Sequence, residues 1–376
     1  MRRESPAQLT SCREALAEYI HAPASSVVFV TNATTGVNVV LRNLVFKPDD
    51  VVLYFSTIYD ACEMTLLYLR ETVGVQLRRV QVNYPVSDDR VCDLLRDAIE
   101  DVKDAGLVPK LAMFDAISSV PGVRVPFERL TKLCRELGVL SLIDGAHSVG
   151  MLSLDMQKLD PDFYVSNCHK WLYVPRSCAF LYVPPRNQAL IRSSLPTSYG
   201  FVPKREHDNR DTPPLDEMAF VKLFNEVGTT DHTSYLAVKS AIEWRKKVTW
   251  ENLKGEEAIK KYCVKQADEA SKMLANRFGT EVLDNEGGDS FMKNVRLPLD
   301  WHELTGGDRA TGVKIAQWIA NSILDEHQSF MAVPIHAENW YLRVSAQIYL
   351  TLQDWDRAAV IMMSVCERVK KGEWKQ

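Results

Sequence analysis

Hydrophobic residues in the first half of the chain follow two alternating patterns. Short apolar runs of strand length occur at residues 27–30, 51–55, 77–82 and 111–114. Between them, apolar residues recur at helical spacing at residues 7–20, 37–44, 94–102 and 127–137. Strands that alternate with helices are typical of a mainly parallel sheet. We therefore predict an α/β fold whose larger domain is built on such a sheet.

The pattern changes near residue 235. A long, charged helical stretch spans residues 250–278, and further helices are expected at 310–324 and 353–369. Short strands are expected near residues 294–297, 330–333 and 341–344. This mixture predicts a smaller α+β domain at the C-terminus. We place the large domain at residues 1–235 and the small domain at residues 236–376.

Polar residues follow several predicted strands directly. Asp144 and His147 come after an apolar run at 139–143, and His169 and Lys170 come after another at 163–165. Parallel sheets bind ligands beyond the carboxyl ends of their strands. Five strand-end residues are therefore candidates for one site: Asn32, Tyr59, Ser119, Asp144 and Lys170.

Residues 31–36, TNATTG, join a predicted strand to a predicted helix and could bind an anion. Asn32 is a good N-cap, and the backbone amides of Ala33 to Thr35 would point out of the helix start. Free amides and the helix dipole together attract phosphate groups. An ordinary capped helix after a strand accounts for the same residues, so this turn alone does not decide between the two.

A lysine and an aspartate at strand ends, with a phosphate-binding turn, are what pyridoxal 5'-phosphate chemistry needs. Lys170 could form an imine with the aldehyde of the cofactor. Asp144 could keep the pyridine nitrogen protonated, so that the ring accepts electrons. Taken singly, an Asp-Gly pair is usually a turn and a lysine is usually a solvated surface residue. The combination predicts a pyridoxal phosphate site.

Composition adds little to this picture. The chain is 46% hydrophobic and 25% charged, and its net charge of −4 gives no reason to expect a nucleic-acid or acidic-membrane partner. The apolar runs are of strand length, so no transmembrane helix is expected, and residues 1–16 lack the apolar core of a secretory signal. The eight cysteines form no CxxC pair, which favours reduced thiols in the cytoplasm. No metal site is predicted.

Five motifs carry a resemblance to a known family: NATTGVN, DGAHSVG, SNCHKW, EVGTTD and LRVSAQIY. In this order and spacing they resemble the class V aminotransferase-like family of pyridoxal phosphate enzymes. Within it they look closest to isopenicillin-N-epimerase-like proteins and hercynylcysteine sulfoxide lyases. The resemblance covers nearly the whole chain and implies the pyridoxal phosphate-dependent transferase fold type I. The HKW motif with DGAH upstream is its more specific part, and NATTG is weak.

The resemblance also implies roles for individual residues. Lys170 would carry the cofactor and move the α-proton of the substrate, Asp144 would pair with the pyridine nitrogen, and His147 would lie near the ring oxygen. The remaining roles that it implies are phosphate binding by Ala33 and Thr34 with His169, ring stacking and catalysis by Tyr59, a reach to the phosphate of a neighbouring subunit by Thr229 or Thr230, and substrate binding by Arg343. Apart from the resemblance, we expect Ser119, at its strand end, to contact the cofactor and Tyr199, in a loop near the site, to contact the substrate. A homodimer with shared active sites is therefore expected. The planar fork of Arg343 suits a bidentate pair with the substrate carboxylate.

The resemblance leaves several reactions open. We expect a C–S lyase that eliminates the β-substituent of a cysteine-derived sulfoxide or conjugate. An isopenicillin-N-epimerase-like epimerase, an aminotransferase and a ring-forming enzyme of secondary metabolism are the alternatives. Cysteine desulfurases carry a nucleophilic cysteine shortly before the carboxylate-binding arginine, whereas residues 327–342, HQSFMAVPIHAENWYL, contain none. A persulfide-forming desulfurase is therefore not expected.

The N-terminus departs from the family pattern. The resemblance implies a longer N-terminal segment with an Asn-His-Gly-like stretch that helps to line the site, and this sequence begins almost directly at the helix before the phosphate strand. Either the sequence is short or the substrate pocket is completed differently. The alternative to an enzyme is a non-catalytic homologue that keeps the fold.

Overall fold

The computed structural model describes residues 5–194, 201, 218–225, 227–283 and 288–375. Its contacts divide the chain into two compact units. The first comprises Met1–Val80, Cys92–Ile117 and Pro126–Lys247, and the second comprises Gln81–Val91, Ser118–Val125 and Val248–Gln376. The sequence pattern predicts a single change of character near residue 235. In the structure, two short segments from the first half of the chain, Gln81–Val91 and Ser118–Val125, also belong to the second unit. Their contacts with it are long-range in sequence, so the local pattern of hydrophobic residues could not reveal them.

A seven-stranded sheet forms the centre of the first unit, in the order β1-β7-β6-β5-β4-β2-β3. Its strands β2 to β6 pair in parallel, whereas β7 runs antiparallel to both β1 and β6. The α/β fold with a mainly parallel sheet is thus confirmed, and the antiparallel edge is an addition that the sequence did not indicate. The strands are β1 (Val27–Val30), β2 (Asp50–Phe55), β3 (Gln76–Val80), β4 (Val108–Asp115), β5 (Leu140–Asp144), β6 (Phe163–Asn167) and β7 (Ala179–Tyr182).

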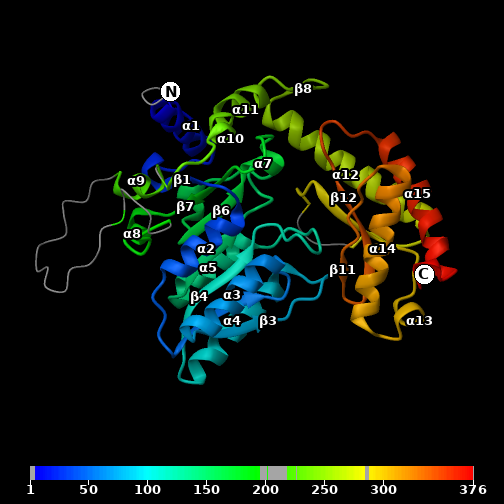
Figure 1. The fold of residues 1–376 in the computed structure, drawn as a ribbon, viewed down its shortest axis with the longest axis horizontal. Coiled ribbons are helices and arrows are strands. Elements are labelled where there is room, and N and C mark those ends of the chain that lie inside the picture. The colour runs from blue at the N-terminus through cyan, green and yellow to red at the C-terminus, as the bar shows by residue number, and fades with distance from the viewer. Residues whose placement is uncertain (1–4, 195–200, 202–217, 226, 284–287, 376) are drawn as a thin grey trace, which may run out of the picture. The chain divides into compact units, whose positions relative to one another are not determined.

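Burial along the strands explains their sequences. Every residue of β2, β6 and β7 is buried, as expected for a sheet covered on both faces, whereas the edge strand β3 is mostly exposed. Helix α2 packs on β6 and β7, and α5 packs on β4 and β5 (Figure 1). The helices are α1 (Ser5–Tyr19), α2 (Ala33–Asn43), α3 (Asp60–Val73), α4 (Asp88–Asp104), α5 (Phe127–Leu137), α6 (Met156–Leu159), α7 (Cys168–Trp171), α8 (Pro185–Gln188), α9 (Ala219–Asn225), α10 (Thr233–Leu236) and α11 (Val238–Arg245), with a short 3-10 turn η1 (Ala24–Ser26).

The second unit contains a three-stranded antiparallel sheet in the order β10-β12-β11, and helix α12 packs on β10 and on α15. Its elements are the hairpin β8 (Thr249–Trp250) and β9 (Leu253–Lys254), α12 (Glu256–Phe278), β10 (Met292–Arg296), α13 (Trp301–Thr305), α14 (Arg309–His327), β11 (Ile335–His336), β12 (Asn339–Ser345), α15 (Leu352–Lys370) and η2 (Glu373–Lys375).

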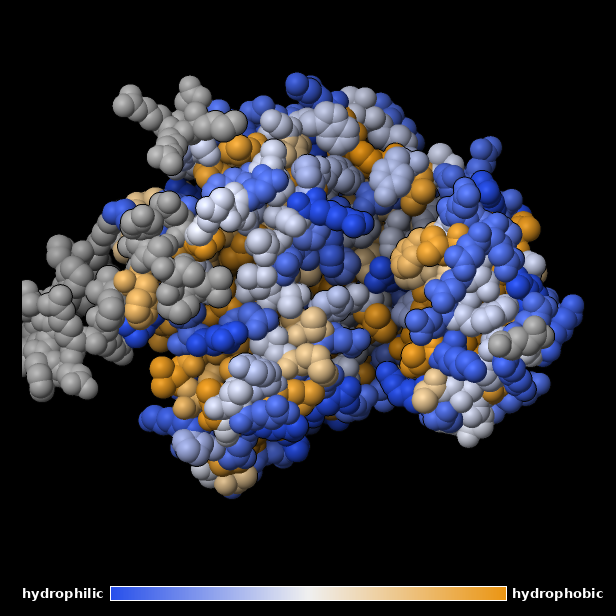
Figure 2. Space-filling view, in the orientation of Figure 1, coloured by the Kyte–Doolittle hydropathy of each residue, from blue (hydrophilic) through white to orange (hydrophobic). Residues whose placement is uncertain are grey.

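On the face in Figure 2, hydrophilic side chains predominate and hydrophobic ones form small separate groups.

Two predicted elements of this unit are wrong in detail. The helix expected from residue 250 begins at Glu256, because residues 249–254 form a hairpin and Gly255 takes a φ of 67°. The strand expected at residues 330–333 is absent. The carbonyl of Ala332 accepts a hydrogen bond from the amide of Arg343, but the regular ladder begins only at Ile335.

Candidate active site

The DGAHSVG and SNCHKW motifs are in direct contact in the first unit. Strands β5 and β6 are parallel neighbours, so the residues that follow them leave the sheet at the same edge. Gly150 closes the first motif with a φ of 85°, and a Cβ atom there would lie 2.3 Å from the carbonyl oxygen of Trp171. Only glycine permits this backbone conformation and this approach. The sequence therefore brings the Asp144 loop onto the Lys170 turn.

Lys170, His147 and Trp171 form a chain of polar contacts. The Nζ atom of Lys170 lies 3.0 Å from Nε2 of His147, and the indole Nε1 of Trp171 donates to Nδ1 of the same imidazole at 3.2 Å. His147 and Trp171 are 7% and 4% exposed, whereas Lys170 is half-buried. Both ring nitrogens of His147 are thus engaged, one of them with Lys170.

Two buried carboxyl groups lie at adjacent strand ends. Asp115 of β4 and Asp144 of β5 pair in register, so their side chains leave the same face of the sheet. Asp144 accepts from the amide of Ala146 at 2.9 Å and from the thiol of Cys62 at 3.5 Å. Oδ2 of Asp115 is buried and has no hydrogen-bond partner in the described part of the chain. Burial raises the pKa of both carboxyl groups, and the charge of Asp144 raises that of Asp115 further.

The N-cap predicted at the turn before helix α2 is present. Asn32 caps helix α2 by accepting from the amide of Thr35 at 2.8 Å. The amide of Ala33 is already used, because it donates to Oδ1 of Asn167 at 2.8 Å. Among the described residues, the amide of Thr34 has no hydrogen-bond partner. Of the predicted pair, Thr34 is therefore the residue whose amide is available to an anion.

His169 is held by the backbone of the strand that follows it. Its Nδ1 atom lies 2.8 Å from the carbonyl oxygen of Cys178 and 3.3 Å from the amide of the same residue. Burial lowers the pKa of His169. Only Nε2 of this ring remains for the predicted phosphate contact.

Three other predicted residues lie on the surface of the first unit. Tyr59, the N-cap residue of α3, is 49% exposed, and Thr229 and Thr230 are exposed in the loop before α10. A cavity of about 620 Å³ is lined by Thr31 and Thr35 at the phosphate turn and by Thr230. Thr230 and the phosphate turn thus share one cavity of the same chain. Tyr199 lies outside the described residues.

Arg343 and Ser119 are both in the second unit. The Nη1 atom of Arg343, on β12, donates to the carbonyl oxygen of Ser119 at 2.9 Å and to its hydroxyl at 3.4 Å. Its Nε atom is buried and finds no hydrogen-bond partner among the residues that the structure describes, and burial lowers the pKa of the guanidinium. Within the described chain, no carboxylate forms an ion pair with Arg343. Arg343 is thus oriented by a neutral residue and has an unsatisfied donor.

Sequence reasoning missed four residues around this site. Trp171 contacts His147, Cys62 contacts Asp144, Asn167 holds the amide of Ala33, and Asp115 lies beside Asp144. The sequence pattern could have identified Asp115, since this residue directly follows an apolar run just as Asp144 does. The other three carried none, because cysteine, asparagine and tryptophan are common packing residues.

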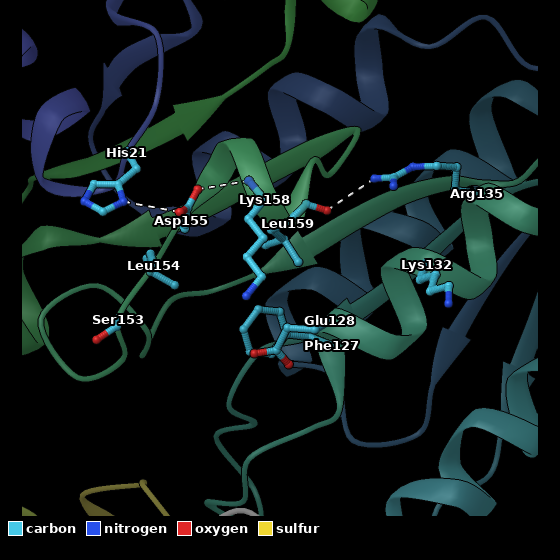
Figure 3. Close-up of a pocket in the computed structure, with 10 residues that line it drawn as sticks. All are labelled: His21, Phe127, Glu128, Lys132, Arg135, Ser153, Leu154, Asp155, Lys158 and Leu159. Atoms are coloured by element: carbon cyan, nitrogen blue, oxygen red, sulfur yellow. Dashed lines mark hydrogen bonds and ion pairs between the residues drawn. The ribbon is translucent and has the colours of Figure 1, made fainter.

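A second cavity of the first unit contains none of the predicted site residues. Its volume is about 510 Å³, and Figure 3 shows its lining from α5, from His21 and from residues 153–159. His21 and Asp155 pair there at 3.3 Å, and Arg135 donates to the carbonyl oxygen of Leu159 (Figure 3).

The described part of the chain contains no cluster of three or more metal-binding side chains and no helix long and apolar enough to cross a membrane. None of the eight cysteines forms a disulfide, and all are buried.

This chain is similar in sequence to several known proteins. The sequence profile described as "Aminotransferase class-V" matches residues 1–287. The L-cysteine desulfhydrase-like protein lolT2 of Epichloe uncinata is 34% identical, over 98% of this chain and 84% of its own. The hercynylcysteine sulfoxide lyase of Schizosaccharomyces pombe is 27% identical, over 96% and 84%. The isopenicillin N epimerase of Streptomyces clavuligerus is 26% identical, over 95% and 84%.

Solved structures share the fold. The complex between the cystine C–S lyase C-DES and its product cysteine persulfide matches with a TM-score of 0.71 at 18% identity, over 96% of this chain and 87% of that one. A lysine mutant of C-DES with glycine covalently linked to its PLP cofactor matches with a TM-score of 0.72 at 17% identity, over 96% and 86%. The predicted fold type I is therefore confirmed.

Proposed function

This chain belongs to the class V aminotransferase family, and on that basis we propose that it is a C–S lyase for a cysteine-derived amino acid. Its cofactor is pyridoxal 5'-phosphate.

The residues of the first unit fit this cofactor. Burial disfavours the charged forms of Asp115 and Asp144, and a protonated ring nitrogen beside Asp144 would restore the ionised carboxylate. The unpartnered amide of Thr34, at the start of α2, suits a phosphate oxygen. Lys170 supplies the amine that the aldehyde requires. We assign the phosphate to Thr34 and His169, the ring nitrogen to Asp144, the ring oxygen to His147 and the ring face to Tyr59. Ala33, whose amide donates to Asn167, lines this turn without a free donor.

The bound cofactor supplies an electron sink for the pair left at the α-carbon when its proton is removed. Lys170 takes that proton at Nζ, and His147, 3.0 Å away, orients this nitrogen. Arg343 holds the substrate carboxylate, because its buried Nε lacks a partner within the described residues and its Nη1 is already fixed by Ser119. A bidentate pair with a carboxylate would satisfy that donor. In this scheme Ser119 orients Arg343, whereas the sequence assigned it a cofactor contact.

Two observations support a lyase: some relatives are named as C–S-cleaving proteins, and the segment before Arg343 contains no cysteine. A relative at 34% identity is a desulfhydrase-like protein, and another relative is a sulfoxide lyase. Residues 327–342 contain no cysteine that could take up sulfur. Expulsion of a sulfur leaving group from the β-carbon needs no such cysteine. Epimerisation is the second candidate, since one relative is an isopenicillin N epimerase.

We further propose a homodimer in which Thr229 or Thr230 reaches the phosphate site of a second copy. Both residues are exposed, so their hydroxyls are accessible to another chain. Tyr199 remains a proposed substrate contact. Equilibrium sedimentation tests the dimer, and a monomeric protein that holds its cofactor would contradict it.

Covalent trapping tests the assignment of Lys170. Borohydride reduction of the loaded protein should leave a pyridoxyl group on Lys170, found by peptide mass spectrometry, and Lys170→Ala should carry none. Lys158→Ala is the matched control, because Lys158 is an exposed lysine of the same unit. A pyridoxyl group on another lysine would sink the assignment.

Product analysis separates the two reactions. Incubation with cysteine-conjugate sulfoxides should release pyruvate and ammonia if the enzyme is a lyase. Exchange of α-deuterium without either product would support the epimerase instead. A protein that holds no cofactor and gives neither result would be the non-catalytic homologue.

A further inference from the structure

We propose that Trp171 is a positioning residue that fixes the tautomer of His147 and thereby keeps Lys170 as the uncharged amine that takes up the cofactor. The inference deepens the proposed function and rests on it for the uptake step only. The hydrogen-bond geometry among the three side chains carries it.

The indole group sets the direction of the first hydrogen bond. Trp171 Nε1 can only donate, and it lies 3.2 Å from Nδ1 of His147. The lone pair of Nδ1 is therefore used, and this nitrogen carries no proton. A neutral imidazole has one N–H group, which must then be on Nε2.

The second hydrogen bond follows from the first. Nε2 of His147 lies 3.0 Å from Nζ of Lys170. An ammonium group has three donors and no acceptor, so it cannot face an N–H group at this distance. A neutral amine has a lone pair and can accept. The arrangement of Trp171 and His147 thus fits Lys170 only as the free amine.

The backbone around these side chains keeps the arrangement in place. Arg245, which is fully buried, donates to the carbonyl oxygen of Trp171 at 2.7 Å and to that of Gly150 at 2.8 Å. It therefore joins the end of the His147 loop to the Lys170 turn. The indole ring is buried beside the turn that carries Lys170, so Trp171 and Lys170 cannot shift independently.

The neighbouring ionisable groups allow an uncharged lysine. Asp115, Asp144, Cys62 and His169 each have an electrostatic effect linked to Lys170. Two ionised carboxylates would favour the ammonium form. Burial, however, raises the pKa of both carboxyl groups and of the Cys62 thiol, and it lowers that of His169. Burial thus favours the neutral form of all four.

The uptake reaction shows why this state matters. The nitrogen of Lys170 forms a carbon–nitrogen double bond with the aldehyde carbon, and the aldehyde oxygen leaves as water with two hydrogens from that nitrogen. No group is oxidised or reduced. An ammonium must first lose a proton, whereas the free amine already has the lone pair that forms the bond.

The tautomer can be measured without any cofactor. Nitrogen-15 NMR of the histidine-labelled apoprotein should show His147 with a bare Nδ1 and a protonated Nε2, and His147→Gln identifies its signals among those of the eight histidines. Trp171→Phe removes the N–H group but keeps an aromatic ring, and it should lose this single tautomer. A protonated Nδ1 in the wild-type protein would overturn the inference.

The rate of pyridoxal phosphate uptake by the apoprotein gives the second readout. Trp171→Phe should slow uptake about tenfold near neutral pH, with recovery at higher pH, because one unit of pKa is a factor of ten in the amine population. His147→Gln should keep the wild-type pH profile, since its amide can accept from Trp171 and donate to Lys170 without titrating. Trp340→Phe, which removes another buried indole donor, is the control for lost stability.

The outcomes separate this inference from the proposed function. A wild-type protein that takes up no pyridoxal phosphate contradicts the proposed function, while the NMR measurement still decides the tautomer. A folded Trp171→Phe protein with unchanged uptake and pH profile contradicts the inference alone.

Discussion

Arg343 donates to the backbone oxygen of Ser119, a residue 224 positions earlier in the chain, at 2.9 Å. The contact lies within the second unit, where Gly122 makes room for the arginine. A Cβ atom on Gly122 would be 3.2 Å from Cδ of Arg343 and 2.6 Å from Cε of Met292. The loop after β4 thus orients this guanidinium group without supplying a counter-charge.

Replacing Arg343 should therefore impair substrate binding. We expect Arg343→Ala to raise KM about 10- to 100-fold, since a hydrogen bond to a charged group contributes about 1.5–3 kcal/mol. Arg343→Lys should restore little, because an ammonium cannot form the bidentate pair. Steady-state kinetics measure both.

Arg296→Ala is the matched control for this experiment. Arg296 lies on the neighbouring strand β10 and pairs with the exposed Glu281. Its loss should leave KM unchanged. Equal effects of the two substitutions would contradict the role of Arg343.

Asp115 should make the apoprotein less stable as pH rises. The pKa of Asp115 in the folded chain is raised above the ordinary value of 3.8 by burial and then by Asp144. The folded state therefore binds this proton more tightly than the unfolded state. The stabilisation is complete below the ordinary value and is lost as pH rises from there through the folded pKa.

Asp115→Asn should accordingly flatten the pH dependence of apoprotein stability and raise the melting temperature at neutral pH relative to the wild type. Thermal unfolding at several pH values measures this. Asp93→Asn, at an exposed position of α4, should leave the wild-type curve unchanged. Parallel curves for wild type and Asp115→Asn would refute the buried, proton-binding state.

Gly150→Ala should be strongly destabilising. The added methyl group would lie 2.3 Å from the carbonyl of Trp171, and the backbone has a φ of 85°. Overpacking costs about 1–3 kcal/mol and the left-handed conformation about 1–2 kcal/mol more. Denaturant unfolding should show the sum.

Gly138→Ala separates the two contributions. Gly138 has a φ of 72°, but a Cβ atom there meets nothing within 4 Å. It should show the conformational cost alone. A Gly150→Ala protein as stable as Gly138→Ala would mean that the loop moves freely away from Trp171.

The cysteines should react slowly in the folded protein. Burial raises the pKa of Cys134 to about 12 and that of Cys366 to about 12, and the thiolate is the reactive form. We expect iodoacetamide to label all eight cysteines after unfolding and few before it, as measured by mass spectrometry. Rapid labelling of Cys62 in the native apoprotein would contradict its burial beside Asp144.

The sequence predicted the elements that local patterns encode. The run before Asp144 and the run before Lys170 are strands β5 and β6, and the cap at Asn32 is present. Contacts between residues far apart in the sequence could not be predicted from a local pattern. The engagement of the Ala33 amide by Asn167 joins residues 134 positions apart, and no periodicity records such a contact. The proximity of Trp171 to His147 depends likewise on the close approach at Gly150.

The reversed direction of β7 restricts how the chain can vary beside the lysine. Asn167 and Ala179 are paired across β6 and β7, so residues 168–178 must leave the sheet and return within one short link. The carbonyl of Cys178 also accepts from the amide of His169 at 3.2 Å, which closes the link on itself. An insertion or deletion here would change the register of β7 or displace Lys170. This link should therefore not tolerate changes of length, even at positions away from His169, Lys170 and Trp171.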